Sequence, residues 1–150
     1  MEGTGTKKTV FICVPMEKSN EKMLERQIAV AIEDYCKVRN CKPEDVVFVD
    51  FLHNLKSTLS KEEIDFVENK AKYPMIRWTA DSISLLGECD EAILAINWTR
   101  SRICKVIATA CENYFIPHIR MMKGEKNPNI EDNQKTIEYR KKHSIDVIWK

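Results

Sequence analysis

The stretch Thr9-Val10-Phe11-Ile12-Cys13-Val14, closed by Pro15, decides the fold class of this chain. Apolar and β-branched residues follow one another here without polar alternation, which is typical of a strand buried on both faces of a parallel sheet. Similar runs predict four more strands, at residues 46–51, 91–96, 117–122 and 145–149.

The segments between these strands carry apolar residues at three- and four-residue steps, which predicts helices. Ser19 or Asn20 offers an N-cap for the first helix, Ser60 and Glu63 have the spacing of a capping box, and Ser101 caps a later helix. Helices are expected at about residues 20–38, 61–71, 75–86, 101–114 and 131–142.

Strands that alternate with helices predict an α/β fold. We expect a doubly wound, mainly parallel five-stranded sheet with helices on both faces, of the flavodoxin-like or Rossmann-like kind. In such folds ligands bind beyond the carboxyl ends of the strands, where the strand order switches. The loops at residues 15–20, 50–54 and 97–102 are therefore the candidate site.

Composition limits the classes of function. The 150 residues fit one domain, which we place at residues 9–150, after a leader at residues 1–8 that we expect to be disordered. This leader has no apolar core, so it does not resemble a signal peptide. A formal net charge of +1 gives no whole-chain attraction to a nucleic acid polymer, and no apolar run approaches the roughly 20 residues that span a membrane.

The six cysteines predict reduced thiols in a cytoplasmic protein. Cys13, Cys89 and Cys104 lie in or beside apolar segments, where a free cysteine behaves as a small hydrophobic residue. No C-x-x-C pair occurs, and the three histidines are widely separated, so we expect neither a metal nor a cofactor.

Three segments together resemble the nucleoside 2-deoxyribosyltransferase-like family, especially its small bacterial and phage members. Residues 10–16 (VFICVPM) resemble the family's opening I-Y-I-x-G-P-M strand and turn. Residues 82–90 (SISLLGECD) resemble its D-x-x-x-L-L-x-x-C-D run, and residues 97–105 (NWTRSRICK) resemble its G-W-x-x-S-R-G-x-R motif. The resemblance covers about residues 9–119 and depends on the order and spacing of the segments.

This resemblance implies chemistry that the chain departs from. The family's nucleophile is a glutamate five residues after the arginine of its S-R-G turn, and it forms a covalent ribosyl intermediate. Counted from Arg102, that position is Ile107, whose alkyl side chain cannot attack carbon. We therefore expect no catalytic residue, with Asp81, Asp50 and Glu17 as the fallback carboxylates.

Other departures fall at the same centre. Two glycines of the family pattern are Val14 and Ile103 here, and Ser82 stands where the family commonly carries an aspartate, with Asp81 just before it. Scaffold positions match while reactive positions differ, which is the pattern of a fold whose pocket has acquired another use.

Cations near the start of the helix after residue 101 favour a phosphate site, because helix N-termini attract anions. The alternative is a solvated surface cluster. Trp98 either stacks on a base or packs within the protein. The residues expected to contact a ligand are Pro15, Met16, Ser82, Trp98, Arg100, Ser101, Arg102 and Lys105.

The preferred hypothesis is a pseudoenzyme that senses or sequesters a nucleotide or nucleoside-derived ligand, such as a cyclic or ADP-ribose-derived signal. The alternative is an active N-glycosidase or deoxyribosyltransferase that uses a displaced carboxylate. The resemblance also implies a homo-oligomer, because family members pair so that neighbours complete each other's pockets.

Overall fold

The computed structural model describes residues 7–122, 135, 138–139 and 142, and it is organised around a parallel sheet. The strands are β1 (Lys8–Cys13), β2 (Val46–Asp50), β3 (Glu91–Leu94) and β4 (His118–Arg120), in the order β2-β1-β3-β4. Each neighbouring pair is parallel. The predicted α/β class is confirmed, but the described sheet has four strands instead of five. The strand predicted at residues 145–149 lies outside the described residues.

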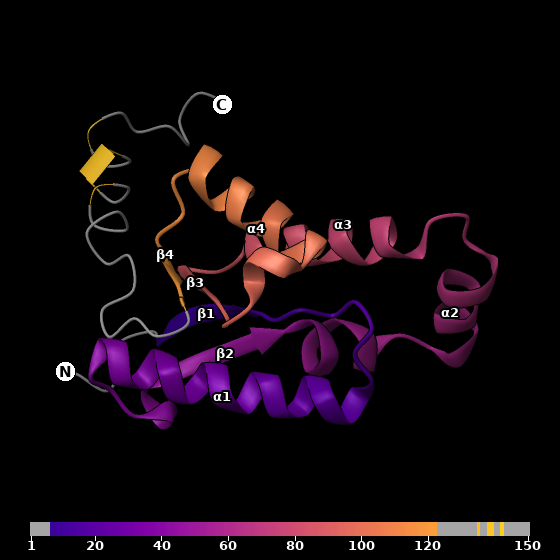
Figure 1. The fold of residues 1–150 in the computed structure, drawn as a ribbon, viewed down its shortest axis with the longest axis horizontal. Coiled ribbons are helices and arrows are strands. Elements are labelled where there is room, and N and C mark those ends of the chain that lie inside the picture. The colour runs from indigo at the N-terminus through magenta and orange to yellow at the C-terminus, as the bar shows by residue number, and fades with distance from the viewer. Residues whose placement is uncertain (1–6, 123–134, 136–137, 140–141, 143–150) are drawn as a thin grey trace.

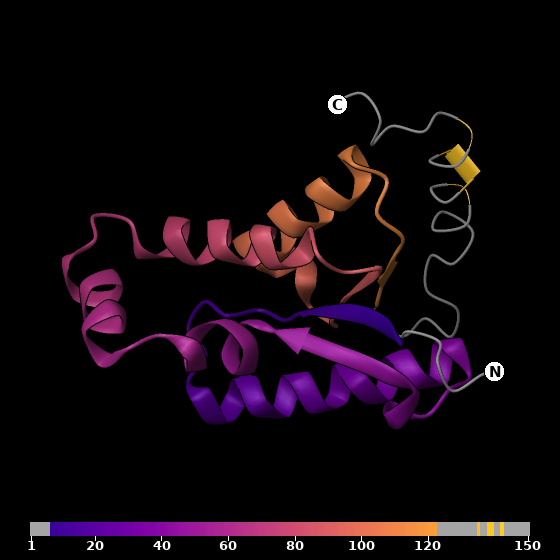
Figure 2. The ribbon, with the colours of Figure 1, turned by 180° about the vertical axis from the view of Figure 1, so that it is seen from behind.

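Helices connect the strands and cover both faces of the sheet. They are α1 (Glu21–Arg39), α2 (Lys61–Asp65), α3 (Pro74–Leu86) and α4 (Arg102–Asn113). α1 lies on one face, and α3 and α4 lie on the other, with α2 extended beyond the sheet (Figure 1). The reverse view in Figure 2 shows the same layers. Short helical turns occupy Pro43–Asp45, Phe51–Leu55, Lys56–Thr58, Phe66–Lys70 and Trp98–Arg100.

For the elements that the structure describes, the predicted boundaries hold to within a few residues, because the caps are where the sequence places them. The helix predicted at residues 131–142 lies mostly outside the described residues. The side chain of Asn20 accepts a hydrogen bond from the backbone of α1, and Ser101 does the same for α4. Ser60 and Glu63 form the predicted capping box. The helix expected at 61–71 is α2 followed by a wider π-helical turn to Lys70. β1 begins one residue inside the predicted leader, at Lys8.

The side chains of β1 divide the core into two layers. Val10 and Ile12 pack in the cluster that includes α1, and Phe11 and Cys13 pack in the cluster that includes α4. Both faces of β1 are therefore covered. This explains why its apolar residues follow one another without polar alternation, as the sequence predicted. The partly buried Met16 contacts both of these clusters and a third around Trp78.

A buried carboxylate lies at the amino ends of the strands, away from the candidate loops. Glu91 is 1% exposed. It accepts hydrogen bonds from the Tyr35 hydroxyl at 2.7 Å, from the Arg39 guanidinium, and from Lys8 Nζ at 3.1 Å. Burial and the hydrogen bond to Glu91 raise the pKa of Tyr35 well above its usual value. These contacts join α1 to β1 and β3, so we assign Glu91 a structural role.

Within the described part of the chain, no helix combines the length and apolar character that crossing a bilayer demands.

Candidate functional site

The strand order places the switch point between β1 and β3. From β1 the chain passes through α1 to the β2 side of the sheet, and from β3 it passes through α4 to the β4 side. The two loops that leave the carboxyl ends of β1 and β3 therefore lie next to each other. Ligands of doubly wound folds bind at this position. The first loop carries Glu17, and the second carries Ser101 and Arg102.

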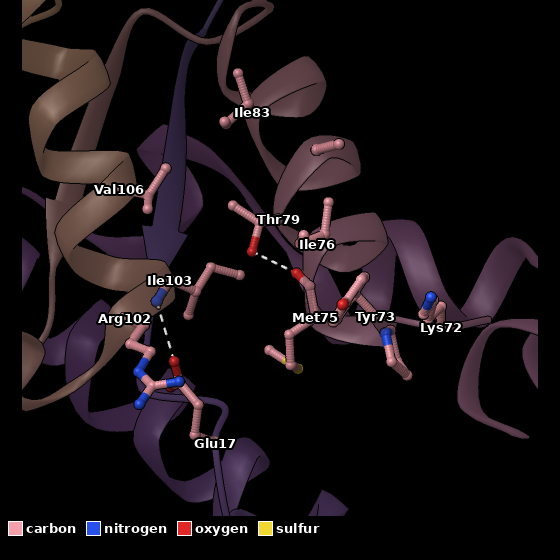
Figure 3. A pocket seen from close by; sticks show the side chains of 12 residues that line it. Glu17, Lys72, Tyr73, Met75, Ile76, Thr79, Ile83, Arg102, Ile103 and Val106 are labelled. Atoms are coloured by element: carbon pink, nitrogen blue, oxygen red, sulfur yellow. Dashed lines mark hydrogen bonds between the residues drawn. The ribbon is translucent and has the colours of Figure 1, made fainter.

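Glu17 joins these two loops through its carboxylate. Ser101 Oγ donates to Glu17 Oε1 at 2.6 Å. The backbone amide of Ile103 donates to Glu17 Oε2 at 3.0 Å (Figure 3). Burial alone would raise the pKa of Glu17, but hydrogen bonds from Ser101 and from the backbone amides of Ile103 and Arg102 outweigh it and hold the pKa below its ordinary value. The carboxylate is therefore ionised at neutral pH.

A cavity of about 680 Å³ extends from Glu17 between α3 and α4. This size lies within the roughly 300–1,000 Å³ typical of small-molecule sites. Glu17, Lys72, Thr79 and Arg102 are its polar side chains, apart from the hydroxyl of Tyr73, and most of the remaining wall is apolar. The residues described around the cavity are Glu17, Lys72, Tyr73, Pro74, Met75, Ile76, Thr79, Ala80, Ile83, Arg102, Ile103 and Val106.

Glu17 supplies the one carboxylate among those lining residues. The other two fallback acids are engaged elsewhere. Asp50 is buried and accepts from the backbone amide of His53 at 2.7 Å. Asp81 accepts from Arg77 Nε at 2.9 Å and lines a separate cavity of about 270 Å³. Of the three fallback carboxylates, Glu17 is therefore the one that a ligand in the larger cavity can meet.

Some of the residues predicted to contact a ligand lie at this cavity, and others do not. Arg102 lines the cavity, and Ser101 reaches it through Glu17. Arg100 and Lys105 are exposed and are absent from the lining. Pro15 and Met16, also absent from the lining, are half-buried.

Trp98 and Ser82 occupy positions different from those expected of ligand contacts. Trp98 is half-buried and packs against the cluster beneath α4, and its ring nitrogen is enclosed without a hydrogen-bond partner among the described residues. Ser82 is 1% exposed, and its hydroxyl is likewise enclosed and unpartnered in the described region. Neither is among the residues that line the cavity.

Ile107, where the resemblance predicts the nucleophile position, lies in the core. Ile107 is 0% exposed and packs with Phe11, Cys13 and Cys104, whereas Val106 lines the cavity. Position 107 therefore faces the sheet and not the crevice. An acid at this position would be buried among apolar side chains and would not reach the cavity.

A second polar cluster was not anticipated from the sequence. His53 Nδ1 lies 3.0 Å from Asp50 Oδ2, and His53 Nε2 pairs with Glu25 on α1. The hydrogen bond to Asp50 raises the pKa of His53, and the charges of Asp50 and Glu25 add to this effect. Because Asp50 and His53 are three residues apart around a helical turn, the i, i+3 spacing could have identified that half of the pair.

The cysteines of the described region are free. Cys13 Sγ and Cys104 Sγ are 3.4 Å apart in the core, and the hydrogen bond between them and burial raise the pKa of Cys13. Thiolates are the reactive form, so this environment favours a packing role. No group of histidine, cysteine and acidic residues among the described positions has the arrangement of a metal site.

No protein-family model matches the chain, and no curated protein and no solved structure matches it.

Proposed function

We propose that this chain binds a nucleotide or nucleoside-derived ligand in the cavity between α3 and α4 and does not turn it over. The observation that carries the proposal is the meeting of Glu17, Ser101 and Arg102 at one end of a largely apolar cavity at the switch point of the sheet. An apolar cavity with a few convergent polar groups at one end is the usual form of a small-molecule site. The apolar walls suit a base, and the polar end suits a sugar.

The walls offer suitable contacts for a flat ring. Tyr73 is 63% exposed at the cavity and can stack on a base. Met75, Ile83 and Val106 give apolar surface on the facing helices. At the other end, the Glu17 carboxylate can accept hydrogen bonds from sugar hydroxyls, as acidic residues do in other doubly wound folds.

Two features favour binding over catalysis. Both oxygens of Glu17 already accept hydrogen bonds, which lowers its basicity. A glycosidase that forms a covalent intermediate commonly needs a second carboxyl group about 5–5.5 Å from the nucleophile. None of the other residues that the structure describes around this cavity is an acid.

The test is a thermal-shift panel of ribonucleosides, deoxyribonucleosides and their 5′-monophosphates, run on wild type and on two variants of α4. Val106→Trp fills the cavity, and Thr109→Trp places the same side chain at an exposed position outside it. A ligand at a hundred times its Kd adds about 2.7 kcal/mol of stability. We expect this shift in wild type and Thr109→Trp and its loss in Val106→Trp. A flat response of wild type to the whole panel overturns the proposal.

A second candidate is an N-glycosidase or deoxyribosyltransferase in which Glu17 attacks the anomeric carbon. The observation in its favour is that Glu17 is an ionised carboxylate in the cavity. Chromatography of nucleosides incubated with the protein measures base release. This candidate would be established if wild type releases the base and Glu17→Gln does not, while Glu17→Gln still binds the nucleoside. That result would exclude binding without turnover.

The homo-oligomer and the cytoplasmic location stay predictions. Exposed apolar side chains on α3 and α4, such as Ile76 at 66% exposure, are compatible with association, and light scattering measures it directly.

A further inference from the structure

The first turn of α4 is already satisfied by groups of the chain itself. Helix N-termini bind phosphate because their first N–H groups have no partner within the helix. Here the amide of Ile103 donates to Glu17 Oε2 at 3.0 Å. The amide of Cys104 donates to Ser101 Oγ at 3.2 Å, and Ser101 Oγ donates in turn to Glu17 Oε1. The Glu17 carboxylate thus occupies the position where an anionic group of a ligand would bind.

We infer that Glu17 determines the charge selectivity of the cavity, so that the ligand presents hydroxyl groups, and no phosphate, to the N-terminus of α4. This inference rests on the proposed function, because it narrows the class of ligand that the same cavity accepts. It goes beyond that proposal by assigning the discrimination to one residue.

A phosphate and a hydroxyl group placed beside Glu17 differ in charge. Two like charges about 4 Å apart near a protein surface repel strongly enough to weaken binding by a factor on the order of a thousand. A hydroxyl meets no such penalty, since it can donate a hydrogen bond to the carboxylate. Lys72 and Arg102 line the same cavity, but both are exposed, so solvent and salt screen their attraction.

The Glu17 side chain cannot rotate away from α4 without breaking its hydrogen bonds to Ile103 and Ser101. If it left, the Ile103 amide and the Ser101 hydroxyl would lose their partner, and Ser101 is 1% exposed. A buried polar group without a partner is costly, so the contact holds Glu17 in place. Its position after β1 is fixed as well, because the preceding Met16 contacts three core clusters.

The experiment measures binding of inorganic phosphate to the full chain by ³¹P line broadening and by the shift of the Ile103 amide resonance. The variant is Glu17→Ala, which removes the competing carboxylate, and the matched control is Glu21→Ala, which removes an exposed carboxylate four residues further along. We expect Glu17→Ala to bind phosphate at least about tenfold more tightly than wild type, given the strength of hydrogen bonds to charged groups. The control should behave as wild type does. Circular dichroism checks folding, and Glu17→Gln replaces Glu17→Ala if the latter does not fold.

The inference is overturned if wild type binds phosphate as tightly as Glu17→Ala does. It is also overturned if the folded variant has no higher affinity for phosphate than wild type. These results are distinguishable from failure of the proposed function. If no nucleoside stabilises wild type, the proposed function falls, whereas the contrast in phosphate binding between wild type and Glu17→Ala is unaffected.

Discussion

Replacement of Glu91 by glutamine tests whether the buried ion cluster holds the amino ends of the strands together. The carboxylate side chain is 2% exposed and is paired with Arg39 and Lys8, while Tyr35 donates a further hydrogen bond. Glutamine keeps the volume of the side chain but removes its charge. The variant therefore leaves the partly exposed Arg39 and Lys8 facing a buried, neutral amide.

The expected loss in the free energy of unfolding depends on how far Arg39 and Lys8 are exposed to solvent. Removing one partner of a buried ion pair costs about 3–5 kcal/mol. The side chains of Arg39 and Lys8 are 23% and 49% exposed, so water partly compensates them, and we expect a loss near the lower limit, about 3 kcal/mol. For a chain of this size about 1 kcal/mol lowers Tm by about 2–4 °C, which predicts a decrease of about 6–12 °C.

Urea unfolding followed by circular dichroism measures this loss, with Glu88→Gln as the control. Glu88 is exposed and lies three residues earlier, so its replacement should change the free energy of unfolding by no more than about 0.5 kcal/mol. Ligand affinity should be unchanged in both variants, because Glu91 does not line the cavity. A loss below about 1 kcal/mol in Glu91→Gln would refute the assignment of this cluster as a stabilising element.

Two further predictions concern residues near the carboxyl ends of the strands and in the core beneath α4. The raised pKa of His53 means that its contribution to stability is fully present below its ordinary pKa of 6.5 and is lost as the pH rises through the raised value. The stability difference between wild type and His53→Gln should therefore shrink across that window in pH-dependent urea melts, and a difference that is constant with pH would contradict the contact with Asp50 and Glu25. Ile107→Glu should lose several kcal/mol and gain no glycosidase activity, because position 107 is 0% exposed and the new carboxylate would be buried without a partner. Ile107→Val, which costs about 0.5–1.5 kcal/mol, is the control, and an Ile107→Glu protein with near wild-type stability would show that this position faces solvent or the cavity.

The elements of the fold could be predicted because their causes are local. The apolar run of β1 and the caps at Asn20, Ser60 and Ser101 are features of contiguous residues, and each is where the sequence places it. The strand predicted at residues 145–149 falls outside the described residues. The order of the strands, by contrast, depends on contacts between distant segments.

The site was predictable only in part, for the same reason. The sequence identifies the loops at the switch point and the cap at Ser101, but not that the Glu17 carboxylate, 84 residues away, fills the anion position beside it. The contact between α3 and α4 that forms the cavity is likewise long-range, which explains why Ile76 and Val106 were not among the expected contacts. The residue pattern of one segment does not show which distant segment it contacts in the fold.

Binding in the cavity between α3 and α4 is measured residue by residue with a ¹⁵N amide shift map of wild type, titrated with the nucleoside that gives the largest thermal shift. We expect the amide resonances of Thr79, Ile83, Ile103 and Val106 to shift, since these residues line one cavity, and those of Cys36 and Asn40 to stay unchanged. A map in which the cavity residues are silent, while residues at the far end of α1 or at the amino ends of the strands respond, would contradict the assignment of this cavity as the binding site.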